Sequence, residues 1–112
     1  MFTEIHSFVE FLKLKEEEPA MLAYFSTEAC NVCKVLKPKV EELIEAEFSK
    51  IKLAYIKSDK LPEVAAQNQI FTAPTIVVFI EGREYIRKSR SIGISELQRE
   101  IEHPYSMMFS EE

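Results

Sequence analysis

The stretch "YFSTEACNVCKVLKP", residues 24–38, contains both cysteines of the 112-residue chain. It begins within a short apolar run, Ala20–Phe25, which is typical of a strand that is buried on both faces. Beyond the cysteines, apolar residues recur at helical spacing and charged residues fill the other positions. Cys30 and Cys33 are therefore predicted to lie where a buried strand passes into a long helix, which Pro38 is expected to kink.

Helix and strand patterns also alternate along the rest of the chain. The expected elements are helices at 7–14, 61–68 and 94–101 and strands at 20–25, 51–57, 75–80 and 85–91, in addition to the long helix. The last helix is expected to begin with a capping box of Ser95 and Gln98 and to be stopped by Pro104. A parallel strand–helix–strand unit followed by an antiparallel hairpin predicts an α/β fold, in which helices cover both faces of a central mixed β-sheet.

Length and composition indicate a single globular domain. The chain has 46% hydrophobic residues, which can fill a core, and its two cysteines are too few for a disulfide scaffold. A net charge of -5 argues against nucleic acid and against an anionic membrane as partners. The N-terminus lacks the cationic lead of a signal peptide, and no apolar run is long enough to span a membrane. We therefore expect a cytoplasmic protein.

The placement of the two cysteines favours redox chemistry over two alternatives. Free backbone N–H groups and the helix dipole at the start of a helix favour a thiolate at Cys30, and a thiolate is the attacking species in disulfide exchange. Cys33 lies close enough to resolve a mixed disulfide at Cys30. A zinc site needs further ligands, and only His6 and His103 remain, at opposite ends of the chain. The other alternative is a pair of inert buried thiols.

Several motifs together resemble the thioredoxin family, and the resemblance runs from about Phe2 to Glu102. The stretch around the cysteines is similar to the active-site strand, C-x-x-C pair and kinked helix of that family. "TAPT", residues 72–75, looks like its cis-proline loop, and two glycines match a hairpin turn and a third active-site loop. The matching positions are Cys30, Cys33, Lys34, Pro38, Pro74, Gly82 and Gly93.

The resemblance implies a role for each matching site residue. Cys30 would be the nucleophile and Cys33 the resolving thiol. Pro74, after a cis peptide bond, would present the backbone of Ala73 to an extended substrate strand. Gly93 and Ala29 would complete the substrate-binding surface.

The same resemblance implies a thioredoxin-like protein-disulfide reductase that acts in cell redox homeostasis. It would use no cofactor beyond the cysteine pair and no metal. Its partners would be protein disulfide substrates and an upstream electron donor such as a reductase, and the protein would be a monomer. The thioredoxin-like domain would comprise residues 1–103, with residues 104–112 as a C-terminal tail whose apolar side chains fold back on the domain or bind a partner. The alternative function is a redox-sensing or binding module of the same fold without significant turnover.

The sequence also departs from the family pattern near the cysteines. Ala29 replaces the usual tryptophan, and Asn31-Val32 replaces the usual Gly-Pro between the cysteines. Tyr24 stands where the family has a buried acid that accepts the proton of the resolving thiol, and Tyr55 stands where a lysine usually pairs with that acid. The resemblance is therefore to a divergent member of the family.

Overall fold

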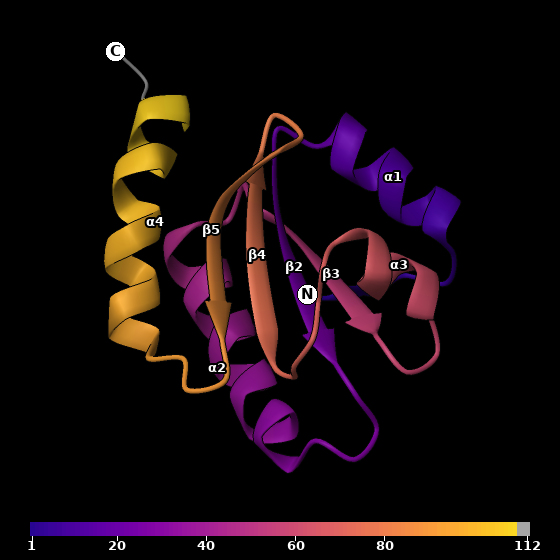
Figure 1. Ribbon diagram of the computed structural model, residues 1–112. Helices are drawn as coiled ribbons and strands as arrows, with labels where there is room; N and C mark the ends of the chain where they lie inside the picture. Colours follow the sequence, from indigo (N-terminus) through magenta and orange to yellow (C-terminus); the bar gives the residue numbers. More distant parts are fainter. Residues whose placement is uncertain (110–112) are drawn as a thin grey trace.

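One mixed β-sheet forms the centre of the structure, a computed structural model that describes residues 1–109 (Figure 1). Its strands lie in the order β1-β3-β2-β4-β5. The strands are β1 (Thr3–Glu4), β2 (Ala20–Ser26), β3 (Lys52–Lys57), β4 (Thr75–Ile80) and β5 (Arg83–Ser89). The helices are α1 (Phe8–Glu17), α2 (Asn31–Glu47), α3 (Pro62–Gln67) and α4 (Ile94–Phe109).

The sheet has a parallel half and an antiparallel half. β3 pairs parallel to both β1 and β2, and α2 provides the crossover between β2 and β3. β4 runs antiparallel to β2, and β5 returns antiparallel to β4 through a tight turn in which Gly82 has a φ of +79°. The predicted α/β fold with a mixed sheet is confirmed.

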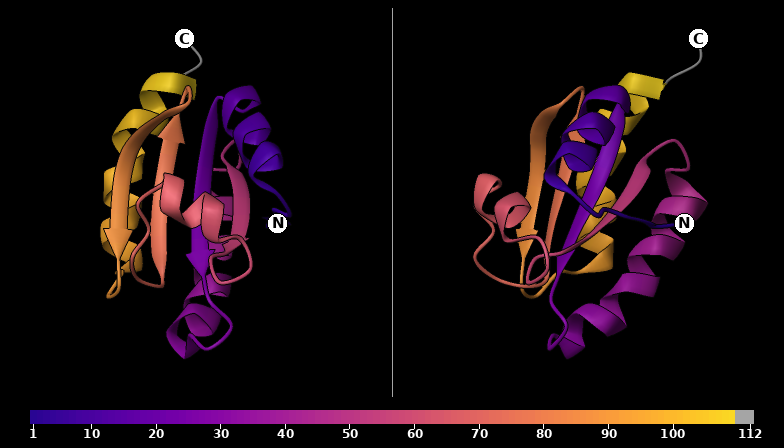
Figure 2. Two further views of the ribbon diagram at one scale, coloured as in Figure 1. Left: turned by 45° about the vertical axis from the view of Figure 1, so that its right-hand side comes forward. Right: turned by 90° about the vertical axis from the view of Figure 1, so that its right-hand side faces the viewer.

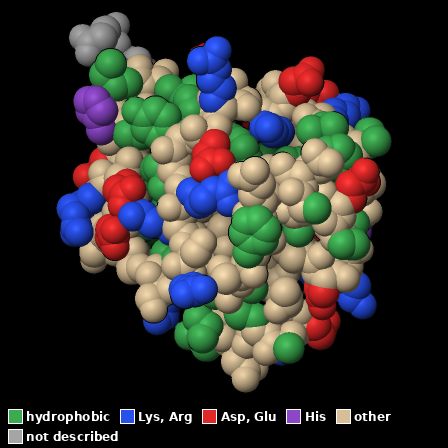
Figure 3. Space-filling view, viewed as in Figure 1, with side chains coloured by type: hydrophobic (Ala, Val, Ile, Leu, Met, Phe, Trp, Pro, Cys, Tyr) green, Lys and Arg blue, Asp and Glu red, His purple; other side chains and the backbone are tan. Residues whose placement is uncertain are grey.

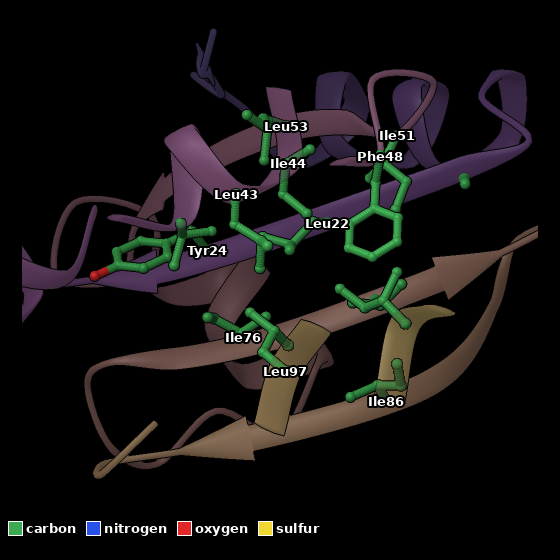
Figure 4. Close-up of a cluster of buried hydrophobic side chains, with 14 of the residues drawn as sticks. Leu22, Tyr24, Leu43, Ile44, Phe48, Ile51, Leu53, Ile76, Ile86 and Leu97 are labelled. Carbon is green, nitrogen blue, oxygen red and sulfur yellow. The ribbon is translucent and has the colours of Figure 1, made fainter. Parts of the chain in front are cut away.

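Helices cover both faces of the sheet, with α1 and α3 on one face and α2 and α4 on the other (Figure 2). The alternation of side chains along β2 supplies both cores. Met21, Ala23 and Phe25 pack toward α1 and α3, whereas Leu22 and Tyr24 pack toward α2 and α4. Tyr24 lies at one end of this second cluster, and its hydroxyl points away from the other labelled side chains (Figure 4).

Three features of the fold differ from the sequence prediction. The two-residue strand β1 was not predicted, because it is too short to show a periodic pattern. The capping box at Ser95 was wrong: α4 begins at Ile94, and the carbonyl of Gly93 accepts the hydrogen bond from the Leu97 N–H. Pro104 does not stop the last helix, since α4 continues to Phe109.

Packing of the C-terminal segment explains why α4 continues through Pro104. A proline inside a helix removes one backbone hydrogen bond, which costs about 3 kcal/mol. Pro104 itself is buried, and beyond it the ring of Tyr105 lies 5.0 Å from that of Phe48 and 4.8 Å from that of Phe109. The Tyr105 hydroxyl also accepts a hydrogen bond of 3.2 Å from the Lys50 N–H. Of the two alternatives for the apolar tail, folding back on the domain is the one seen for Tyr105, Met108 and Phe109, whereas Met107 is exposed. Residues 110–112 lie outside the described part.

These contacts predict that the C-terminal segment stabilises the domain. Tyr105→Ala should lower the free energy of unfolding by about 2 kcal/mol, because it removes a partly buried ring, two aromatic contacts and one hydrogen-bond acceptor. Met107→Ala is the matched control, because Met107 lies two residues after Tyr105 in the same helix and is 71% exposed. This substitution should change stability by less than about 0.5 kcal/mol. Urea unfolding of the two variants measures the difference. Equal stabilities would mean that residues 104–109 are a dispensable tail.

Candidate redox site

The cysteine pair lies at the junction of β2 and α2, as the sequence predicts. β2 ends at Ser26, and a turn brings the Cys30 N–H to within 3.2 Å of the Thr27 carbonyl oxygen. Cys30 has an extended backbone and is the N-cap of α2. An N-cap side chain normally accepts a hydrogen bond from one of the free N–H groups of the first helical turn. Here the Cys33 N–H donates to the Cys30 sulfur over 3.1 Å.

The two sulfur atoms are joined in a disulfide, across a Cα–Cα distance of 5.3 Å. The two residues differ in their accessibility. Cys30 is partly exposed at the surface, whereas Cys33 is only 1% exposed and belongs to the core between the sheet and α2. This arrangement provides one sulfur that an external molecule can reach and a second sulfur that is shielded from solvent behind it.

A second loop faces the cysteines from the start of β4. The Ala73–Pro74 peptide bond is cis. The loop is held on both sides, because the Thr75 hydroxyl donates to the Thr72 carbonyl over 2.8 Å and the Arg90 N–H donates to the Pro74 carbonyl over 2.9 Å. Within residues 1–109, the N–H and C=O of Ala73 have no hydrogen-bond partner. This backbone is therefore available to an added strand.

Between these loops lies an open groove of about 950 Å³. Its walls come from the β2–α2 turn, the loop before β4 and the loop between β5 and α4. Five of the six predicted site residues line it, and the sixth, Cys33, lies directly behind Cys30. The five are Ala29, Cys30, Ala73, Pro74 and Gly93.

The groove also has residues that the sequence prediction missed. Phe71 is 87% exposed and Val32 is 59% exposed, and both line the groove. Exposed apolar side chains beside a reactive group are typical of a binding surface rather than of ordinary solvent-facing structure. Phe71 shows no helical or strand periodicity, so only its position three residues before Pro74 could have identified it. Ile92 and Arg90 extend the wall toward α4.

Tyr24 lies beneath the disulfide, fully buried. Its hydroxyl donates a hydrogen bond of 2.7 Å to the carbonyl oxygen of Cys33. Burial, and then the neighbouring Tyr55, raise the pKa of Tyr24 well above its usual value of about 10. Tyr24 stands where the thioredoxin pattern described in the sequence analysis has a buried acid. Its neutral hydroxyl donates to the first turn of α2 and cannot accept a proton at pH 7.

Tyr55 extends this polar cluster to the surface. Its ring stacks on Tyr24 with the centroids 6.1 Å apart, and its hydroxyl donates to Ser26 over 3.2 Å. The ammonium group of Lys37 lies 4.0 Å from the centroid of the Tyr55 ring, a cation–π contact. Two stacked tyrosines and a lysine on α2 thus occupy the place of the acid–lysine pair.

Acidic side chains flank the other side of the cysteines. The Glu28 N–H donates to the carboxylate of Asp59 over 3.2 Å, which ties the β2–α2 turn to the loop after β3. Both Glu28 and Asp59 are exposed. The Glu28 carboxylate is thus exposed to water, whereas Cys33 is buried.

No group of three or more potential metal-ligating side chains occurs within residues 1–109. His6 and His103, which the metal alternative would require, lie before α1 and on α4. Across the same described residues, no helix has the length and apolar character needed to span a membrane.

Comparison with known proteins gives a consistent result. The family model described as Thioredoxin matches residues 3–103. Thioredoxin-like protein YdfQ of Bacillus subtilis is 29% identical over 105 residues, which cover 94% of this chain and 93% of that protein. Thioredoxin of Buchnera aphidicola is 36% identical over 84 residues, which cover 74% of this chain and 75% of that protein.

Solved structures show the same likeness. A mutant thioredoxin from Halobacterium salinarum NRC-1 matches with a TM-score of 0.80 and 25% identity, over 90% of this chain and 88% of that one. The oxidised form of mitochondrial thioredoxin 3 from Saccharomyces cerevisiae has a TM-score of 0.81 at 21% identity, over 90% of this chain and 93% of that one, and supports the fold alone.

Proposed function

Because the chain belongs to the thioredoxin family, a family of thiol–disulfide oxidoreductases, we propose that it reduces disulfide bonds in protein substrates. The observation that carries the proposal is the Cys30–Cys33 disulfide, in which one sulfur faces an open groove and the other is buried behind it. Reduction of a protein disulfide needs this division between an accessible nucleophile and a shielded resolving thiol.

In the first step, the thiolate of reduced Cys30 attacks one sulfur of the substrate disulfide. A mixed disulfide forms between Cys30 and the substrate, and the other substrate sulfur leaves as a thiolate and takes up a proton. The N-terminus of α2 favours the attacking form, because the Cys33 N–H already points at the Cys30 sulfur and the helix dipole stabilises negative charge there.

In the second step, Cys33 loses its proton and attacks the Cys30 sulfur. The Cys30–Cys33 disulfide forms, and the second substrate sulfur leaves as a thiolate. The substrate has then gained two electrons and the protein has lost two, so the product is the oxidised form described above. An upstream dithiol donor, such as a reductase, must return these electrons for turnover.

Substrate binding follows from the backbone of the loop before β4. The free N–H and C=O of Ala73 support pairing with an extended segment of the substrate, in the manner of an added strand. Ala29, Gly93 and the exposed Phe71 would then flank the substrate cysteine. We further propose that the protein works as a monomer in the cytoplasm.

Insulin reduction tests the proposal against a binding or redox-sensing module of the same fold. With a small dithiol as electron donor, the reductase should accelerate precipitation of the insulin B chain by at least about tenfold over the donor alone. A module without turnover would leave the rate at that of the donor. The reduction potential of the cysteine pair then distinguishes a reductant near about -270 mV from an oxidant near about -120 mV.

A further inference from the structure

Arg90, in the loop that follows β5, differs from the two basic residues that precede it at the end of this strand, Arg87 and Lys88. Arg87 donates to Glu84 over 2.8 Å and to the carbonyl of Asn68, and Lys88 pairs with Glu96 at 2.7 Å. The Arg90 guanidinium has no hydrogen bond or ion pair with any described residue. It is exposed and lines the groove that contains Cys30.

The backbone fixes Arg90 at the edge of this groove. Its N–H donates to the carbonyl of Pro74 over 2.9 Å, which ties its backbone to the cis-proline loop. It has a φ of +65°, a left-handed conformation that glycine or asparagine adopts with less strain than arginine does. The backbone conformation of the turn therefore does not explain why an arginine occupies this position. The arginine side chain instead provides an unpaired positive charge beside the groove.

Arg90 lines the groove from the loop between β5 and α4. The acidic residues Glu28 and Asp59 stand in the loops after β2 and β3, where they adjoin lining residues in the sequence but do not line the groove themselves. In Figure 3, Lys and Arg side chains are visible at the lower left of this face, and both acidic and basic side chains at the lower right. Another nearby cation, Lys39, lines a separate hollow on α2 with Val35 and does not line this groove.

We propose that Arg90 selects substrates by binding a carboxylate, so that the preferred disulfides are those with an Asp or Glu within about two residues of the attacked cysteine. The proposal rests on the proposed reductase function and specifies its substrate class. An arginine without an internal partner can form a charge-assisted hydrogen bond with a carboxylate of a strand that pairs with Ala73. Substrates with lysine at the same position would be disfavoured at this side of the groove.

The expected size of the preference is modest. An exposed ion pair changes an equilibrium or a rate by only about 1.5-fold to 5-fold, because water screens it and two flexible side chains must be ordered. We therefore expect Glu peptides to react roughly threefold faster than matched Gln peptides. Raising the salt concentration from about 0.05 M to about 0.5 M should shrink this ratio, since the Debye length falls well below the size of the groove.

A chromogenic exchange reaction measures this ratio directly. Short peptides with a single cysteine are joined through a mixed disulfide to thionitrobenzoate, and they carry Glu, Gln or Lys two residues before or after the cysteine. Attack of reduced Cys30 on the peptide sulfur forms the Cys30–peptide disulfide and releases thionitrobenzoate, which is followed by absorbance. Second-order rates are compared among the native protein, Arg90→Gln, Arg90→Glu and the control Arg83→Gln. Arg83 is an exposed arginine at the other end of β5.

The native protein and Arg83→Gln should prefer Glu over Gln and Gln over Lys. In Arg90→Gln, the ratio of the rates for the Glu and Gln peptides should fall to about one. In Arg90→Glu, the Lys peptide should react fastest and the Glu peptide slowest, so the ratio of the Glu rate to the Lys rate should differ about tenfold from that of the native protein. A native protein that exchanges the Gln peptide but shows no Glu preference would overturn the inference and leave the reductase function standing. A Glu-to-Gln rate ratio in Arg90→Gln equal to that of the native protein would also overturn the inference. Absence of exchange with every peptide would instead contradict the reductase function itself.

Discussion

Cys30→Ser should abolish reduction of protein disulfides, with kcat/KM falling by about a thousandfold or more. The reaction requires a sulfur nucleophile that forms the mixed disulfide, and a serine hydroxyl neither ionises at neutral pH nor forms that bond. Cys33 cannot take over the attack, because it is 1% exposed behind Cys30. Insulin reduction with a fixed donor concentration measures the loss.

The matched control for this variant is Cys33→Ser. It keeps the nucleophile and removes the resolving thiol, so it should form mixed disulfides with substrates that persist on a non-reducing gel and in intact-mass spectra. Cys30→Ser and the double variant should form none. Limiting iodoacetamide gives an independent check on the native protein in its reduced state: Cys30 should be labelled first, and prior labelling of Cys33 would reverse the assignment of roles.

Much of the fold could be predicted because its elements have strong periodic patterns. The buried run that became β2 and the helical spacing that became α2 are long enough to identify each element and its order. The continuation of α4 through Pro104 could not be predicted, because a local rule about proline competes with long-range contacts to Phe48 and Lys50. Those contacts involve residues that the sequence places more than fifty positions away.

The site residues also fall into those that sequence motifs identified and those that they did not. Cys30, Cys33 and Pro74 occur in recognisable motifs, and the structure brings them together around one groove and its buried wall. Phe71 and Arg90 belong to the same groove but lie in loops, where no repeating pattern marks a residue that faces a site. Whether Arg90 has an ion-pair partner depends on which side chains the fold places around it, and the sequence does not specify these neighbours.

The buried Tyr24 should slow the second step of exchange, in which Cys33 attacks the mixed disulfide. Cys33 must lose its proton while it is buried. A carboxylate beneath it would accept that proton near neutral pH, since burial raises the pKa of a carboxyl group toward the working range. Tyr24 is neutral at pH 7 and donates its own hydrogen bond to the Cys33 carbonyl, so it offers no acceptor. The proton must leave through water or through Glu28.

The raised pKa of Tyr24 also has a consequence for stability. A tyrosine in the unfolded chain ionises near pH 10, whereas the buried Tyr24 keeps its proton to higher pH. The contribution of this residue to stability should therefore be complete below about pH 10 and be lost as the pH rises above it. Tyr24→Phe should remove this alkaline dependence, and chemical unfolding at pH 8 and at about pH 11 measures it. An unchanged dependence would assign it to other groups.

Decay of the mixed disulfide in the native protein should accelerate by about tenfold per pH unit between pH 6 and 8, because the fraction of Cys33 thiolate grows tenfold per unit below its pKa. Stopped-flow measurement after mixing with an excess of substrate follows this decay. Glu28→Gln tests the exposed carboxylate: it should slow the decay if Glu28 relays the proton, and it should leave the rate unchanged if water alone does so. Decay that is fast and independent of pH in the native protein would show that the missing acid has no kinetic cost.

Tyr24→Asp should accelerate the decay at pH 7 and flatten its pH dependence, because it restores a proton acceptor beneath Cys33. The substitution should also lower the free energy of unfolding by about 3 kcal/mol or more, since it leaves a cavity and buries a carboxyl group. Circular dichroism therefore has to establish that the variant is folded at the assay temperature. Tyr24→Phe removes the hydroxyl without adding an acceptor, so it should retain the steep pH dependence of the native protein. Equal profiles for a folded Tyr24→Asp and for Tyr24→Phe would mean that water delivers and removes the proton whatever residue lies beneath Cys33.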